Sequence, residues 1–147
     1  MKTLIIYSSS HHANTEKIAF AMAEVLGADV LKASNVKQDD INKYDTIGIG
    51  SGIYGGRFNK DLIAFVDGAD FSGKNAFVFS TSGFGKSDFN ISMTAHLENK
   101  NAKIIGSFAC KGFDTFFIFK LFGGVAKGHP DADDIKNAQD FARGLRI

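Results

Sequence analysis

The sequence predicts an α/β fold in which a doubly wound parallel sheet of five strands lies between two layers of helices. Short apolar runs, each bounded by Gly, Ser, Asn or Asp, alternate with segments of helical spacing. The runs at 4–6 and 76–79 are apolar at every position, which is typical of parallel strands covered by helices on both faces. Such sheets bind ligands beyond the carboxyl ends of their strands, so we expect the site in the loops after strands one, three and four.

The order of these runs assigns each element. We predict strands over residues 2–7, 29–32, 46–50, 75–80 and 103–109. We predict helices over residues 14–26, 59–66, 88–99 and 133–145. The first helix places Ile18, Met22 and Val25 on one stripe and is followed by Gly27, a common residue at a helix end. Only residues 33–44 show no clear helical pattern.

Composition limits the classes of function. At 147 residues the chain fits a single domain, residues 1–147, and no repeat or linker divides it. The net charge of +1 argues against nucleic acid as a partner and predicts that docking of a protein partner depends weakly on salt. The only cysteine, Cys110, excludes an internal disulfide framework and is expected to be a small core residue. With no signal-peptide pattern and no apolar run of bilayer length, we expect a cytoplasmic protein that does not span a membrane.

The loop after the first strand contains residue types that bind phosphate. It runs from Ser8 to Ala13 and leads directly into the first helix. A helix N-terminus carries about half a positive charge and unpaired N–H groups, so it can hold a phosphate without a lysine or arginine. The candidate ligands are Ser8, Ser9, Ser10, His11, Asn14 and Thr15. Helix capping alone is the alternative for these residues. The neighbouring histidines at 11 and 12 diverge and make a poor metal pair.

This stretch resembles the FMN phosphate loop of the flavodoxin family, in which Ser or Thr residues precede Gly-Asn-Thr-Glu. The ending Asn14-Thr15-Glu16 is retained, whereas Ala13 stands where glycine is usual and the loop looks one residue longer. The resemblance covers residues 2–145 and implies a flavodoxin-like sheet of order 2-1-3-4-5 with one noncovalent FMN. It leaves two functions open: intracellular electron transfer, or an FMN-dependent NAD(P)H or quinone oxidoreductase, which the longer loop favours.

Two further loops would complete a flavin site in this family. After strand three the candidates are Ser51, Gly52, Ile53, Tyr54, Gly55 and Gly56. The resemblance implies that Tyr54 stacks on the flavin ring and that the Gly55–Gly56 peptide can rotate toward flavin N5. After strand four the candidates are Ser82, Gly83 and Phe84, at the polar edge of the flavin. An ordinary flexible turn with a packed tyrosine is the alternative for the loop after strand three, and a core position is the alternative for Phe84.

Other motifs occur in the same loops. Residues 50–55 spell the dinucleotide fingerprint G-x-G-x-x-G, but the strand that follows does not end in the required acid. Residues 80–87 nearly match the loop G-x-x-x-x-G-K-[ST], with Ser80 in place of the first glycine and no suitable aspartate for magnesium. A phosphate-accepting receiver domain would need acidic residues after strand one, where this chain has serines.

The segment from Phe113 to Phe122 contains five phenylalanines in ten residues. We expect it either to pack under the last helix or to form an apolar patch that borders the flavin. As a patch it would serve docking or self-association, so a homodimer is one expectation. The expected partners are a redox protein or a small-molecule acceptor.

Overall fold

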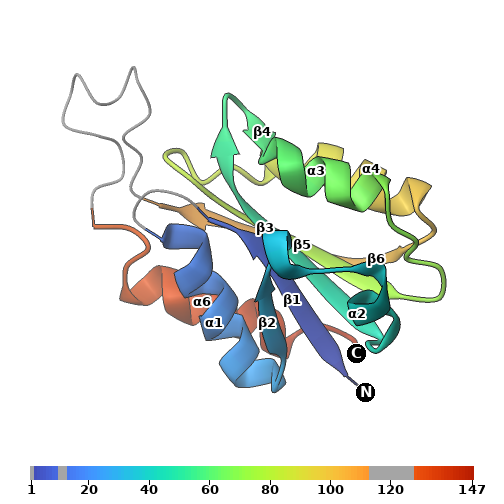
Figure 1. The fold of residues 1–147 in the computed structure, drawn as a ribbon. Coiled ribbons are helices and arrows are strands. Elements are labelled where there is room, and N and C mark those ends of the chain that lie inside the picture. The colour runs from blue at the N-terminus through green and yellow to red at the C-terminus, as the bar shows by residue number, and fades with distance from the viewer. Residues whose placement is uncertain (1, 10–12, 113–127) are drawn as a thin grey trace.

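The computed structural model describes residues 2–9, 13–112 and 128–147, and its sheet has the predicted order. The parallel strands are β1 (Thr3–Ser8), β2 (Asp29–Lys32), β3 (Thr46–Tyr54), β5 (Asn75–Ser82) and β6 (Lys103–Lys111). They lie side by side in the order β2-β1-β3-β5-β6, which is 2-1-3-4-5 in the predicted numbering. A short strand, β4 (Arg57–Phe58), pairs antiparallel with the end of β3. The predicted doubly wound α/β sheet is confirmed (Figure 1).

Helices cover both faces of the sheet. One face packs against α1 (Asn14–Leu26) and α6 (Ala132–Arg143). The other packs against α2 (Gln38–Asn42), α3 (Lys60–Asp67) and α4 (Ile91–Asn99). Figure 1 shows α1 and α6 below the sheet and α3 and α4 above it. Two 3-10 turns, η1 (Ala33–Asn35) and η2 (Ser87–Asn90), precede α2 and α4. Within the described ranges no helix is long and apolar enough to cross a bilayer.

The alternation of strand side chains builds two separate cores. In β1, Leu4 and Ile6 face the α3 layer, whereas Ile5 and Tyr7 face α1 and α6. All four side chains are buried, which explains why the strand is apolar throughout. Both faces of the sheet are therefore closed by helices, and the loops at the two ends of the strands remain for ligands.

The first helix has the predicted bounds, because both of its ends carry strong local signals. Gly27 adopts a left-handed conformation with φ 63° and its N–H bonds the carbonyl of Ala23, as expected of a glycine that ends a helix. Ala13 at the other end is also left-handed, with φ 51° and ψ 35°. This conformation explains why glycine would be usual there, since the Cβ of an L-residue makes it unfavourable.

Several predicted boundaries were wrong. Residues 33–44 contain η1 and the five-residue helix α2, which begins where Asp40 accepts the Lys37 N–H at 2.9 Å. A helix this short has too few turns to show a period in sequence. Strand β3 continues to Tyr54, four residues beyond its predicted end, and the helix predicted from residue 88 begins at Ile91 after η2.

Candidate functional site

Three loops meet at the carboxyl edge of the sheet. Strands β1, β3 and β5 are neighbours, and Ser8, Ser51 and Ser80 stand opposite one another in a single row across them. From β1 the chain order runs one way to β2 and the other way to β3, so the loops lie at the point where the winding reverses. The predicted candidate loops are thereby brought together at the place where such folds bind ligands.

The first turn of α1 opens onto this edge. The first bond within the helix runs from the Lys17 N–H to the Ala13 carbonyl at 3.2 Å, so the N–H groups of Thr15 and Glu16 have no acceptor inside the helix. The Tyr7 hydroxyl donates to Glu16 at 3.0 Å. Burial, followed by this contact with Glu16, raises the pKa of Tyr7 to about 12. Ser10 and His11 lie outside the described residues.

The start of α1 is fixed to the strands beside it. The Thr15 hydroxyl is buried and lies 2.9 Å from the hydroxyl of Thr81 in β5. Because this hydroxyl bonds within the protein, Thr15 would bind a ligand through its backbone N–H and not through its side chain. A Cβ at Gly112 would lie 2.8 Å from Nδ2 of Asn14, so the chain after β6 also passes close to this turn. These contacts hold the N-terminus of the helix in a fixed orientation.

The loop after β3 is a tight hairpin. Gly55 and Gly56 both have positive φ, 59° and 80°, and they join the paired residues Tyr54 and Arg57. Two central residues with positive φ are the signature of the type I′ hairpin turn. A Cβ at Gly52 would come 3.0 Å from the Tyr54 hydroxyl, so the tyrosine side chain lies close to the backbone of its own strand.

The Ser51 side chain stabilises this hairpin instead of facing outward. Ser51 is fully buried, donates to the Gly52 carbonyl at 2.6 Å and accepts the Asn59 N–H at 3.0 Å. Of the candidates in this loop, Gly52, Ile53 and Tyr54 are partly exposed and the two turn glycines are exposed. The exposed candidates are therefore at the tip, and Ser51 has a structural role beneath them.

The loop after β5 presents one aromatic side chain to solvent. The Ser82 hydroxyl accepts the Gly85 N–H at 2.8 Å and turns the chain, while Gly83 is buried. Phe84 is 56% exposed, with the Lys86 ammonium 6.0 Å from its ring centroid. The alternative that Phe84 is a core residue was wrong, because its ring lies at the surface beside the site.

A cavity of about 310 Å³ lies next to the phosphate-loop candidates. Its polar lining consists of Ser8, Ser9, Lys32 and Ser34, with Asn59 and Asp61 from the start of α3. Sequence reasoning missed Lys32 and Asn59. Their positions at the carboxyl edge of the sheet could have indicated them. Lys32 is the last residue of β2, and the Asn59 side chain caps α3 by accepting the N–H groups of Asp61 and Leu62.

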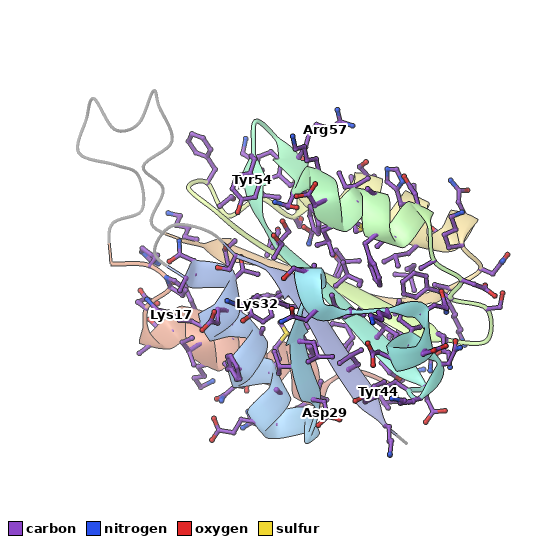
Figure 2. The ribbon with its side chains drawn as sticks, viewed as in Figure 1. Lys17, Asp29, Lys32, Tyr44, Tyr54 and Arg57 are labelled. Carbon is purple, nitrogen blue, oxygen red and sulfur yellow. The ribbon has the colours of Figure 1, made fainter. Side chains whose placement is uncertain are left out.

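The geometry fits an anionic, ring-bearing ligand. A helix N-terminus, two partly exposed serines and a nearby lysine can hold an anion, and two aromatic side chains stand on the adjoining loops. Figure 2 shows Lys17 and Lys32 at the ends of α1 and β2, with Tyr54 and Arg57 near the hairpin. Fold and site together define a doubly wound protein with a ligand site at the switch point of its sheet.

The chain belongs to the flavodoxin-domain family, because the family model described as "Flavodoxin domain" matches residues 4–120. An uncharacterised protein of Methanocaldococcus jannaschii is 48% identical over 147 residues, which cover 99% of this chain and 98% of that protein. This match extends the similarity over nearly all of both chains.

Solved structures share the fold at low sequence identity. Oxidised flavodoxin 2 from Bacillus cereus is 20% identical with a TM-score of 0.72, over 97% of this chain and 96% of that one. A flavodoxin from the domain Archaea is 16% identical with a TM-score of 0.68, over 97% and 94%. The apo form of an NADH:FMN oxidoreductase is 17% identical with a TM-score of 0.63, over 99% and 90%. The same architecture thus occurs in flavodoxins and in an oxidoreductase.

Proposed function

We propose that the chain binds one FMN noncovalently at the carboxyl edge of its sheet and transfers electrons between redox partners. The observation that carries this proposal is the first turn of α1, which opens beside the serine loop at the same edge of the sheet as the loops that contain the aromatic residues at 54 and 84. Membership of the flavodoxin-domain family supports it. Bound FMN would supply the redox chemistry, and the protein would position it and tune its surroundings.

Each candidate residue has a role in this proposal. Backbone N–H groups of Asn14 and Thr15, with Ser8 and Ser9 and the Ser10–His11 part of the loop, would hold the phosphate. Tyr54 would stack on the ring with Gly52 and Ile53 beneath it. The backbone at Gly55–Gly56 would face the central ring, and residues 82–84 would border its polar edge. Ser51 would act indirectly, by holding the hairpin in place.

The second candidate is an FMN-dependent NAD(P)H or quinone oxidoreductase. The specific observation in its favour is the loop between Ser8 and Asn14, which looks one residue longer than the flavodoxin pattern that it resembles. Turnover separates the two functions, because a carrier needs a partner reductase and oxidises NAD(P)H slowly by itself.

The test is an absorbance spectrum of the purified protein after FMN has been added and the excess washed away. We expect flavin bands near ~370 and ~450 nm to remain, and riboflavin, which lacks the phosphate, to bind at least about tenfold more weakly. Addition of NADPH should leave the bands largely unchanged for a carrier and bleach them for an oxidoreductase. Loss of both flavins on washing would refute the FMN site, and equal affinities would refute the role of the phosphate loop.

A further inference from the structure

Four exposed cations surround the aromatic residues of the site. Arg57 lies in the hairpin after β3, Lys60 begins α3, Lys86 is in the loop after β5 and Lys111 ends β6. We call these four residues, with Tyr54 and Phe84 between them, the basic face. Two acidic residues lie in the same segments, Asp61 and Asp88. The basic face therefore carries an excess of positive charge.

Among the described residues, no ion pair neutralises the cations of the basic face. Within residues 2–9, 13–112 and 128–147, the ion pairs of lysine and arginine join Lys43 to Asp40, and Lys136 and Arg143 to Asp140. These pairs lie in α6 or at the C-terminal end of α2, away from the hairpin. The acidic group Asp131, Asp133 and Asp134 begins α6 in the opposite helical layer, at the same carboxyl edge of the sheet, where Asp131 and Asp134 lie near Cys110. The net charge of +1 therefore does not describe the region around the hairpin and the loop after β5, where Arg57, Lys60 and Lys86 outnumber Asp61 and Asp88.

A hollow in the basic face combines apolar walls with positive charge. It has a volume of about 470 Å³ and lies between β4 and α3. Tyr54, Phe58 and Ile63 provide its apolar lining, and Arg57 and Lys60 stand at the same hollow. This combination suits a partner that presents an apolar side chain between two carboxylates. The apolar side chain would enter the hollow, and the carboxylates would contact Arg57 and Lys60.

We infer that the basic face is the docking surface for an acidic redox protein. The inference rests on the proposed function, since it places the partner against the aromatic residues that would border the flavin. Complementary charge would steer the partner and would be screened by salt, because the Debye length shortens from about 30 Å at 0.01 M to about 10 Å at 0.1 M. This inference therefore expects a strong salt dependence, whereas the net charge alone predicts a weak one.

The test is an NMR titration of the ¹⁵N-labelled chain at low salt, without and with FMN. The acidic probe is zinc-substituted rubredoxin and the basic probe is cytochrome c. We expect rubredoxin to shift amide signals of residues 54–60, 84–88 and 111, with an affinity that falls at least about tenfold on raising the salt to ~0.1 M. No shifts, shifts centred on the other end of the sheet, or tighter binding of cytochrome c would overturn the inference.

Charge-reversal variants locate the effect. The double variant Arg57→Glu/Lys60→Glu should bind rubredoxin at least about tenfold more weakly, because two attractive charges on the basic face become repulsive. The matched control is Lys74→Glu/Lys103→Glu, which changes the net charge equally but lies at the amino ends of β5 and β6. Equal losses in both variants would show an effect of net charge and reject the basic face. FMN retention is measured separately by absorbance. Loss of the flavin would refute the proposed function, and the rubredoxin affinity of the FMN-free chain would still test the basic face.

Discussion

Replacing Gly50 with alanine is expected to be among the most damaging small changes in the sheet. Gly50 stands opposite Phe79 in neighbouring strands, and the phenyl ring lies across the glycine. A Cβ added at Gly50 would come 2.1 Å from both Cε2 and Cζ of that ring. Phe79 is fully buried and packs against the ring of Phe77, with centroids 6.3 Å apart, so it has little room to move.

The magnitude follows from this geometry. Carbon atoms in ordinary contact lie about 3.5–4.0 Å apart, so the ring or the strand must shift by more than ~1 Å. Overpacking of a core costs roughly 1–3 kcal/mol, and a clash this close belongs at the upper end. The lower entropy of an unfolded chain with alanine offsets about 0.4–1 kcal/mol of that. We therefore expect Gly50→Ala to lower the free energy of unfolding by about 2 kcal/mol.

The assay is urea unfolding of Gly50→Ala, of Phe79→Leu and of the double variant. If the ring causes the loss, Phe79→Leu should relieve it, and the double variant should be at least ~1 kcal/mol more stable than the sum of the single changes predicts. Gly68→Ala is the control, since its nearest contact would be an ordinary 3.5 Å and its φ of −91° suits alanine. A Gly50→Ala loss below ~0.5 kcal/mol, or strict additivity, would refute the reasoning.

Three further results are expected. In urea unfolding Ala13→Gly should gain about 0.5–1 kcal/mol and Gly27→Ala should lose about 1 kcal/mol, because both positions are left-handed; opposite signs would contradict this. Burial and Glu16 raise the pKa of Tyr7 to about 12, so the folded state keeps a proton that the unfolded chain loses above its ordinary value of 10.0. Stability should therefore fall between pH 10 and 12, and less steeply in Tyr7→Phe. Burial raises the pKa of Cys110 to about 12, so iodoacetamide at pH 8 should label it only after unfolding, as mass spectrometry would show.

The sheet could be predicted because its signals are local. Each strand is an apolar run closed by turn residues, and α1 ends at Gly27, whose left-handed conformation few other residues adopt. The position of Ala13 was also informative. Sequence comparison with the flavodoxin pattern singled it out as a departure, and its φ of 51° shows the backbone conformation that makes glycine usual there.

The hairpin after β3 was missed although its signal was present. Gly55–Gly56 is a two-residue turn between Tyr54 and Arg57, and a Gly-Gly pair between two extended runs predicts a type I′ hairpin. Sequence analysis expected either a peptide able to rotate beside a ligand or an ordinary flexible turn, and it assigned no hairpin. The role of Ser51 could not be predicted, since its bond with the Asn59 N–H joins residues on the two sides of a turn whose geometry was not assigned.

The charge around the site could also have been predicted, had each charge been placed on the predicted fold instead of summed. Lys32 ends a strand, Lys60 begins a helix, and Lys86 and Lys111 follow the fourth and fifth predicted strands. In a parallel sheet all of these positions face the carboxyl edge, because every strand ends there and every crossover helix starts there. The same rule places the acidic start of α6 at this edge, so the excess of positive charge is confined to the region around the hairpin and the loop after β5. A net charge sums these regions and does not show how they differ. Docking depends on the charges within about a Debye length of the contact, so the proposed partner would respond to the charges around the hairpin and not to the net charge of the chain.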